Sequence, residues 1–322
     1  MKNGDNCPSM LTGPACPLVL GGSYFDPGQF AGEKRRELLR TMQRALELGV
    51  NHFDTAAGYA AGESERVLGE FVRTCGAPRE SVFVATKSAV DEMEAPLMHA
   101  EVDQSLKRLG LEYIDLFYIH WPRRGKDPRP LMEGLVDAKR RGKIRAIGVS
   151  NFSVEQMTAV REVGPLDAHQ MGYNLFWRKP EREIIPYCRE NGIAVVTYSS
   201  IAQGIMTGKF GPTLEFPPGD PRANIVFFGD DVWPHVYDAV ERLKPLAAET
   251  GRTLVELGIR WVIAQSGVTA AVVGARNEQQ VRANVAALEG DIPDDVFDRM
   301  TAISDAVQPF FPDIPNMYNY LP

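Results

Sequence analysis

The chain has 322 residues, of which 44% are hydrophobic and 24% are charged, and its formal net charge is −7 at pH 7. A chain of this length can bury a large core, either as one α/β domain or as two smaller domains. Acidic and basic residues are interspersed, which together with the net negative charge argues against nucleic acid as the main partner. The four cysteines lack Cys-X-X-Cys spacing, which is typical of thiols in a reducing compartment.

Membrane and export signals are missing from the sequence. No window approaches the roughly 20 apolar residues that a membrane-spanning helix needs. The N-terminal residues also lack an apolar segment of signal-peptide length. We therefore expect a cytoplasmic protein with no membrane partner, and the sequence gives no indication of its oligomeric state.

Short apolar runs alternate with helical patterns along the chain. The strand-like runs lie at 17–23, 50–54, 81–87, 113–121, 144–151, 165–170, 193–200 and 268–274. The helical patterns lie at 33–49, 63–76, 95–110, 130–142, 153–164, 181–192, 235–250, 253–266, 278–288 and 294–305. Strands that alternate with helices in this way indicate parallel βαβ units.

Eight such units predict a (β/α)8 barrel, or TIM barrel, with residues 1–322 as a single domain and with extra helices and long loops at its C-terminal face. An open dinucleotide-binding sheet would carry GxGxxG at the start of its first helix, and the sequence has none there. Residues 201–232 exceed ordinary loop lengths and predict a functional lid or a disordered segment. The tail, residues 306–322, is rich in proline and aromatic residues and is expected near the substrate mouth.

Four ionisable residues follow neighbouring strand-like runs, where a barrel of this kind carries its active site. Asp54 ends the second run, and Tyr59 follows it across a stretch of small residues. Lys87 ends the third run and His120 lies at the end of the fourth. Each residue alone has an ordinary explanation, such as a cap, a solvated charge or core packing. Their convergence on one mouth favours a shared site.

These residue types together suit proton transfer to or from an oxygen. A free tyrosine has a pKa of about 10, too high for efficient proton donation at neutral pH. A buried Lys87 ammonium is expected to lower the pKa of Tyr59, while Asp54 keeps the ammonium charged. His120 could hydrogen-bond the same substrate oxygen. The sequence shows no nucleophile and no metal-ligand cluster, so we expect a cofactor to supply the electrons.

The last strand-like run offers a site for that cofactor. Gly274 allows the backbone to approach a ligand closely, and Arg276 follows at the start of a helix whose N–H groups favour a phosphate. Phosphate sites at the last βα loops are typical of this barrel. An arginine suits a terminal phosphomonoester, which predicts NADP(H) rather than NAD(H).

Five motifs follow one another along the chain. They are DTAAGY with GESERVLGE, YIDLFYIHWP, IRAIGVSNFS, AVVTYSSIAQGIMTGKF and VVGARNEQQVRANV. Together they resemble the aldo-keto reductase superfamily over nearly the whole length. The resemblance implies a catalytic tetrad of Asp54, Tyr59, Lys87 and His120, with Tyr59 as the acid/base and no metal.

The resemblance also implies which residues contact the cofactor and the substrate. The carboxamide is expected at Ser150, Asn151 and Gln170, with Tyr198 stacked on the nicotinamide. The pyrophosphate is expected at Ser199, Ile201, Gln203, Lys209 and Arg222, under the 201–232 loop. The adenosine 2′-phosphate end is expected at Gly274, Arg276, Gln280 and Asn284. The substrate pocket is expected at Trp121, joined by Tyr24 and Phe25.

Three features depart from the family pattern, and none of them touches the tetrad. Ala283 stands where an acidic residue commonly contacts the adenine, so that contact is expected to be lost. Ala60 replaces a common glycine after the tetrad tyrosine. Residues 1–17 match the usual N-terminal β-hairpin poorly.

Three functions compete for this sequence. The leading interpretation is an NADPH-dependent oxidoreductase that interconverts a carbonyl substrate (aldehyde, ketone or sugar) and its alcohol. The alternative is a non-catalytic or regulatory NADP-binding barrel, like a channel-associated subunit, because some such relatives keep their tetrads. A metal-dependent barrel hydrolase using Asp54, His120 and His169 is the third.

The substrate mouth is expected to combine aromatic and basic side chains. The residues are Trp121, Phe176, Trp177, Arg123, Arg124 and Lys126. Aromatic walls suit sugars and flat apolar carbonyls alike. The basic segment 123–126 either attracts an anionic substrate or is a solvated charge run on a surface loop, and the sequence leaves this choice open.

Overall fold

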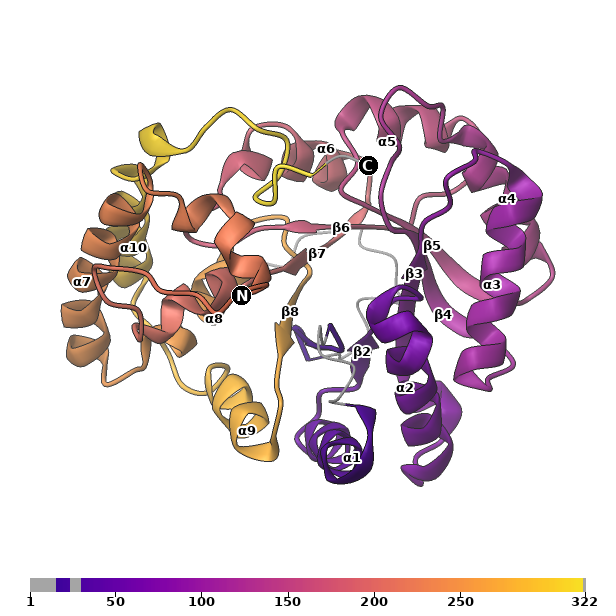
Figure 1. The fold of residues 1–322 in the computed structure, drawn as a ribbon, viewed down its shortest axis with the longest axis horizontal. Coiled ribbons are helices and arrows are strands. Elements are labelled where there is room, and N and C mark those ends of the chain that lie inside the picture. The colour runs from indigo at the N-terminus through magenta and orange to yellow at the C-terminus, as the bar shows by residue number, and fades with distance from the viewer. Residues whose placement is uncertain (1–15, 24–29, 321–322) are drawn as a thin grey trace.

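The computed structural model describes residues 16–23 and 30–320. In this part of the chain, eight parallel strands form a closed barrel in sequence order, with β8 paired to β1. They are β1 Leu18–Gly21, β2 His52–Asp54, β3 Phe83–Ser88, β4 Ile114–Ile119, β5 Ile144–Ser150, β6 Ala168–Gly172, β7 Ala194–Tyr198 and β8 Ala270–Gly274. Figure 1 shows the strands at the centre with helices around them. The predicted (β/α)8 barrel is confirmed.

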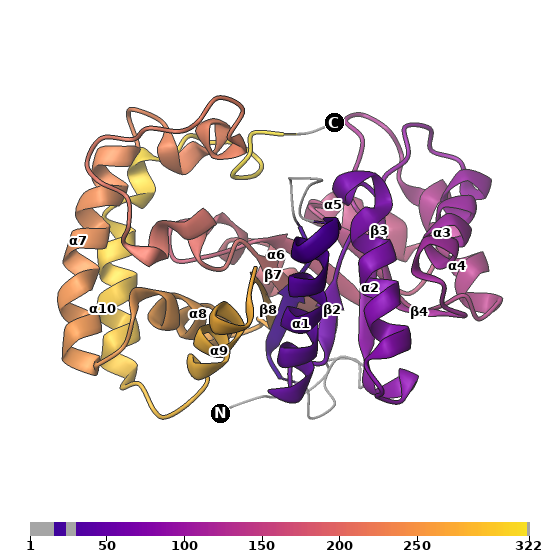
Figure 2. The same cartoon turned by 60° about the horizontal axis from the view of Figure 1, so that its bottom comes forward.

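The helices cover the outside of this barrel. They are α1 Gly32–Glu47, α2 Glu63–Thr74, α3 Ala95–Leu109, α4 Arg129–Arg140, α5 Val154–Arg161, α6 Ile184–Glu190, α7 Trp233–Thr250, α8 Leu254–Ala264, α9 Glu278–Ala286 and α10 Asp294–Asp305. In Figures 1 and 2, α7 and α10 lie side by side. None of the described helices combines the length and the apolar character needed to cross a membrane.

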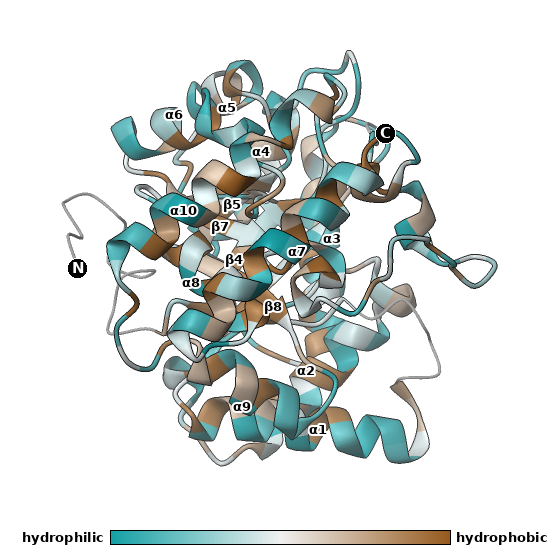
Figure 3. Ribbon diagram, turned by 90° about the vertical axis from the view of Figure 1, so that its left-hand side faces the viewer, coloured by the Kyte–Doolittle hydropathy of each residue, from teal (hydrophilic) through white to brown (hydrophobic). Residues whose placement is uncertain are grey.

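Local sequence explains where several helices begin and end. Ser153 and Thr253 each form a capping box at the start of α5 and α8, respectively. The third helix, α3, is capped at its C-terminal end by Gly110, whose φ of 65° is a left-handed conformation that favours glycine. Brown and teal residues alternate along the helices in Figure 3, as expected when one face packs on the barrel and the other faces water.

Small side chains leave room inside the barrel. Alternate residues of a strand face the same side, and the interior cluster contains Leu116 and Tyr118 together with four alanines, Ala85, Ala146, Ala168 and Ala194. Gly148 of β5 faces the Tyr118 ring, and a Cβ at this position would overlap that ring. The barrel therefore accommodates one large aromatic ring because its neighbours are small.

The segment 201–232, expected as a lid or a disordered segment, is built from short turns. It contains three 3₁₀ helices, η5 Ala202–Thr207, η6 Pro221–Asn224 and η7 Val226–Phe228. Aromatic rings from Phe210, Phe216, Phe228 and Trp233 pack together beneath these turns, with centroids 5.0 to 6.2 Å apart. The three phenylalanines of the segment thus pack together and against Trp233, the first residue of α7.

Gly148→Ala is expected to reduce the free energy of unfolding by about 1–3 kcal/mol, because its methyl group overpacks the barrel interior against Tyr118. Urea unfolding followed by circular dichroism would measure this. Gly211→Ala is the matched control, since a Cβ there meets no atom closer than 3.9 Å. Equal unfolding midpoints for Gly148→Ala and wild type would contradict the packing argument.

Candidate functional site

The polar residues expected at the strand ends share the inward-facing side of their strands with the interior alanines. Lys87 lies two residues beyond Ala85 in β3, and Gln170 lies two residues beyond Ala168 in β6. Because side chains repeat their direction every second residue in a strand, both point into the mouth of the barrel. The same alternation directs Tyr198 inward at the end of β7.

Lys87 and Asp54 form a buried ion pair at the centre of this mouth. Lys87 Nζ lies 2.5 Å from Asp54 Oδ1 and donates to the Thr55 carbonyl at 2.9 Å, while the two side chains are only 2% and 5% exposed. Burial disfavours the charge on Lys87, but Asp54 and the Tyr59 hydroxyl outweigh it and raise the pKa of Lys87 above its ordinary value. The ammonium therefore stays charged at neutral pH.

Gln170 completes the surroundings of Asp54. Its Nε2 donates to Asp54 Oδ2 at 2.8 Å, so both carboxylate oxygens have a partner. From the family resemblance, we expected Gln170 only at the carboxamide of the nicotinamide, and its contact with Asp54 was not predicted. The available signal was its place as an inward-facing polar residue at a strand end.

Tyr59 and His120 lie next to the ion pair. Lys87 Nζ is 5.3 Å from the centre of the Tyr59 ring, and the Tyr59 and His120 rings meet edge-on with centroids 5.9 Å apart. Burial, aided by the charge of Lys87, lowers the pKa of His120 to about 3. The imidazole is therefore neutral at physiological pH and offers a single N–H donor.

The expected influence of Lys87 on Tyr59 is present, but the net pKa shift of Tyr59 runs in the opposite direction. Lys87 does favour the phenolate, but burial raises the pKa of Tyr59 by more, and the nearby Asp54 charge adds to that increase. The pKa of Tyr59 therefore lies above its ordinary value, and the phenol stays protonated at neutral pH. The site therefore holds a protonated phenol beside a fixed positive charge.

Asn151 links the ends of three strands. Its Nδ2 donates to the His120 carbonyl at 3.3 Å and to Ser150 Oγ at 3.0 Å, and its Oδ1 accepts from the Tyr198 hydroxyl at 2.6 Å. Its φ of 64° is left-handed, a conformation that asparagine visits more readily than most residues. Three of the four residues expected at the nicotinamide end, Ser150, Asn151 and Tyr198, thus form one connected group beside His120.

The segment after β7 carries further expected cofactor residues. Gln203 Nε2 donates to Ser199 Oγ at 2.5 Å, and Ile201 is half-buried against the core. Partial burial and the charges of Arg222 and Arg276 lower the pKa of Lys209. Lys209 therefore lies near two arginines from different loops, of which Arg222 is already paired with the Asp220 carboxylate at 2.5 Å.

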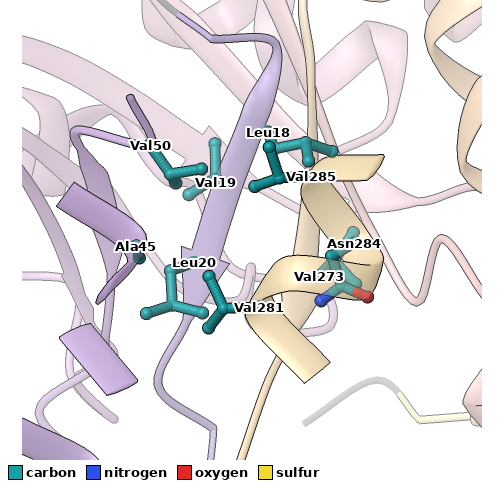
Figure 4. A pocket seen from close by; sticks show the side chains of 9 residues that line it. All are labelled: Leu18, Val19, Leu20, Ala45, Val50, Val273, Val281, Asn284 and Val285. Atoms are coloured by element: carbon teal, nitrogen blue, oxygen red, sulfur yellow. The ribbon is translucent and has the colours of Figure 1, made fainter. Parts of the chain in front are cut away.

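The end of β8 is open to solvent at Gly274 and Arg276. The Arg276 backbone N–H donates to Gln280 Oε1 at 2.9 Å, and Asn284 Nδ2 donates to the Gly274 carbonyl at 3.3 Å. Figure 4 shows Asn284 on α9 beside Val273, at the edge of a small, mainly apolar pocket between β1 and α9. Within the described residues, the Arg276 guanidinium forms no ion pair, so its charge is available to a ligand.

Trp121 lies between the tetrad and the C-terminal tail. Its ring stacks on His120 with centroids 6.1 Å apart and meets the Tyr320 ring edge-on at 5.1 Å. The tail was expected near the mouth, but Tyr320 was not predicted as the tail residue that contacts Trp121. Tyr24 and Phe25, the other expected substrate residues, lie outside the described residues.

Phe176 and Trp177 do not line the mouth, contrary to expectation, because both are buried in the core at 0% and 2% exposure. The basic segment also has partners of its own. Arg123 pairs with the Asp91 carboxylate at 2.7 Å, and Lys126 donates to the Asp91 carbonyl at 2.8 Å. These contacts favour the interpretation of a surface charge run over that of an anion site.

His169 does not join Asp54 and His120. It is next to Gln170 in β6, so it faces the opposite side of the strand, where it is fully buried and its Nε2 accepts from the Phe152 N–H at 3.2 Å. Across residues 16–23 and 30–320, no three His, Cys, Asp or Glu side chains are grouped to hold a metal ion. The metal-dependent hydrolase site is therefore not formed.

The buried His169 predicts acid sensitivity. Burial lowers the pKa of His169 to about 3, against an ordinary value of about 6.5. Between these values the unfolded chain binds a proton that the folded chain excludes, so the free energy of unfolding decreases as the pH falls. His169→Gln should reduce that slope by about 1.4 kcal/mol per pH unit, measured by urea unfolding between about pH 6 and pH 4. An unchanged slope would contradict this expectation.

Comparison with known proteins agrees with this geometry. The model of the aldo/keto reductase family matches residues 17–305. Aldo-keto reductase YhdN of Bacillus subtilis (strain 168) is 37% identical over 285 residues, which cover 84% of each chain. The NADH-specific methylglyoxal reductase of Escherichia coli (strain K12) is 33% identical over 295 residues, covering 85% of this chain and 89% of that protein. The structure of glycerol dehydrogenase AKR11B4 from Gluconobacter oxydans is similar with a TM-score of 0.81 and 31% identity, covering 91% of this chain and 93% of that one.

A (β/α)8 barrel with a buried lysine–aspartate pair beside a tyrosine at its mouth is the framework of an oxidoreductase. The chain belongs to the aldo/keto reductase family. The family and the enzyme class expected from the sequence are thereby confirmed, while the roles of individual site residues stay predictions.

Proposed function

We propose that the protein is an NADPH-dependent oxidoreductase that transfers a hydride between nicotinamide and a carbonyl or alcohol substrate, with Tyr59 as general acid/base. One observation carries this proposal: the buried Asp54–Lys87 pair lies beside a half-buried, protonated Tyr59. Nicotinamide, when bound, supplies or accepts the hydride. The chain itself has to manage the proton and the charge that develops on the substrate oxygen.

In the reductive direction, Tyr59 donates its proton to the substrate oxygen, and in oxidation it takes a proton back. The Lys87 charge stabilises the phenolate that donation leaves behind. Because Asp54 and the Thr55 carbonyl already hold the ammonium in place, this stabilisation requires little reorganisation during the reaction. The neutral His120 imidazole donates its N–H to the same oxygen and orients the substrate.

The basic residues fit a phosphorylated dinucleotide. Lys209 lies near Arg222 and Arg276; Arg222 is paired with Asp220 at 2.5 Å, which leaves Lys209 and Arg276 as the charges open to an anion. Arg276 immediately precedes the N-terminal end of α9, whose dipole adds to the attraction for an anion. Hydrogen bonds from arginine to phosphate are strong because both partners are charged. The unpaired charge of Arg276 beside the start of α9 supports binding of a 2′-phosphate there. The similar E. coli protein is named NADH-specific, so the cofactor choice depends on particular side chains rather than on the family.

The substrate we infer is a small aldehyde, ketone or sugar-like molecule. The similar E. coli protein is named for methylglyoxal reduction, and the similar Gluconobacter structure is a glycerol dehydrogenase. Trp121 and Tyr320 place aromatic rings beside His120, and such rings suit the C–H faces of small polyols and carbonyls.

Tyr59→Phe is expected to lower kcat by about 10²- to 10⁴-fold, because it removes the proton donor and leaves the surrounding charges unchanged. A panel of carbonyls and alcohols followed by NADPH absorbance would measure this. The Kd for NADPH, from protein fluorescence, should stay within about twofold because the removed hydroxyl serves proton transfer. Near-normal turnover in Tyr59→Phe would contradict the assignment. NADPH binding by a wild-type protein that turns over no substrate would instead favour the regulatory barrel.

Arg276→Ala is expected to raise the Kd for NADPH by about 10- to 100-fold and to leave that for NADH nearly unchanged, because only NADPH carries the 2′-phosphate. Arg282→Ala is the matched control, since Arg282 is an exposed arginine on the same helix and interacts with Glu47. Isothermal titration with both cofactors would measure the effect. Equal wild-type affinities for NADPH and NADH would show the 2′-phosphate argument to be wrong.

A further inference from the structure

The C-terminal tail crosses the barrel mouth in a turn that is organised by Asn316. Asn316 is 8% exposed, its Oδ1 accepts from the backbone N–H groups of Tyr318 at 3.0 Å and Tyr320 at 3.3 Å, and its Nδ2 donates to the Tyr320 carbonyl at 2.5 Å. Figure 2 shows the yellow tail at the top of the molecule, beside the loops that precede α7. The position of Tyr318 is therefore set by the side chain of a buried asparagine.

Met317 ties this turn to both the barrel and the 201–232 segment. It is fully buried, and its carbonyl accepts from the Val226 N–H at 3.0 Å. At the end of β6, Gly172 leaves room for it, since a Cβ there would overlap the Met317 methyl group. The hydrogen bonds of Asn316 and the buried side chain of Met317 thus hold the tail in place next to Tyr318.

Tyr318 contacts three of the residues that are expected to meet the cofactor. Its ring stacks on Tyr198, with centroids 6.1 Å apart and an angle of 19° between the planes. Its hydroxyl lies 3.2 Å from Ser199 Oγ and accepts from Gln203 Nε2 at 3.0 Å. The tail therefore touches the expected nicotinamide platform with its ring and the expected pyrophosphate residues with its hydroxyl.

The segment that Tyr318 contacts has an unusual backbone. Ser199, Ala202, Gln203 and Gly204 have φ values of 57°, 49°, 55° and 93°, all in the left-handed region. Non-glycine residues in this region are strained, and they persist when surrounding contacts hold them. The Tyr318 hydroxyl supplies such contacts to two of these residues, Ser199 and Gln203.

The hydrogen bonds among Ser199, Gln203 and Tyr318 leave one hydrogen-bond donor unused. Gln203 Nε2 carries two hydrogens, and the Ser199 and Tyr318 hydroxyls carry one each, which makes about four donors by type. The triangle of contacts among the three side chains uses three of them. One hydroxyl hydrogen, from Ser199 or Tyr318, therefore remains for an outside acceptor such as a phosphate or amide oxygen.

We propose that Tyr318 is a positioning residue for the cofactor, which holds Ser199 and Gln203 in the left-handed conformation that presents their polar groups to the dinucleotide. The inference rests on the proposed function, because it requires a nicotinamide dinucleotide at these residues. It goes further by making the C-terminal tail a part of cofactor binding as well as a neighbour of the substrate.

Tyr318→Phe removes only the hydroxyl and keeps the ring on Tyr198. The Kd for NADPH, measured by isothermal titration, is expected to rise by about 3- to 10-fold, the effect of losing one net hydrogen bond. At saturating NADPH, kcat should stay within about twofold of wild type. Asn316→Ala should also raise this Kd, because it releases the turn that carries Tyr318.

Two controls separate positioning from general destabilisation. Tyr320→Phe removes a hydroxyl from the same tail, and since that hydroxyl has no partner among the described residues, the Kd for NADPH should not change. Adenosine 2′,5′-bisphosphate carries only the Arg276 end of the cofactor. Its Kd should therefore be equal in wild type and Tyr318→Phe, which a general loss of stability would not predict.

The outcomes are distinct. Weaker NADPH binding with unchanged bisphosphate binding would support the proposal. Wild-type affinity in Tyr318→Phe, or tighter binding because Tyr318 competes with the cofactor, would overturn it and leave the proposed function intact. A wild-type protein that binds neither NADPH nor NADH would overturn the proposed function and this inference together.

Discussion

The buried ion pair between Lys87 and Asp54 is the constraint on which the rest of the site depends. A charge removed from water costs several kcal/mol unless an opposite charge and hydrogen bonds replace the solvent. Lys87 therefore needs Asp54 and the Thr55 carbonyl, and Asp54 in turn needs Gln170. These partners come from β2, β3 and β6, which a closed barrel brings to one rim.

The two ends of the proposed cofactor site differ in how charge is balanced. Beside Tyr59, the positive Lys87 is paired, so the proton-transfer site has little net charge. At the other end, Asp220 pairs with Arg222, whereas Arg276 has no acidic partner among the described residues. The whole chain is acidic at −7, so the unpaired Arg276 guanidinium differs in sign from the chain's net charge, which is consistent with the proposed phosphate contact.

Much of this arrangement could be predicted from the sequence, because it depends on local periodicity. The ends of the strands and the alternation of side chains along them can be recognised in the order of residues. These patterns predicted that Asp54, Lys87 and His120 lie together at one mouth of the barrel. The sign of the Tyr59 pKa shift was not predictable in this way, because it depends on how deeply the phenol is buried. Burial is a property of the complete fold.

Long-range packing accounts for the other differences. Trp177 was expected in the mouth, but it packs against Phe311 of the tail with centroids 6.1 Å apart, a contact between residues more than a hundred positions apart. The tail has no helical or strand periodicity, so its aromatic residues gave no indication of which ones reach the site. Gln170 was found as a site residue, but its bond to Asp54 joins strands that are not neighbours.

The placement of the tryptophans has a spectroscopic consequence. Of the four tryptophans in the chain, Trp177, Trp233 and Trp261 are at most 4% exposed, whereas Trp121 is half-buried at the barrel mouth between His120 and Tyr320. A collisional quencher dissolved in water therefore reaches the indole of Trp121 more readily than the others. The protein thus carries a native optical probe at the barrel mouth, in contact with His120 and Tyr320, that needs no added label.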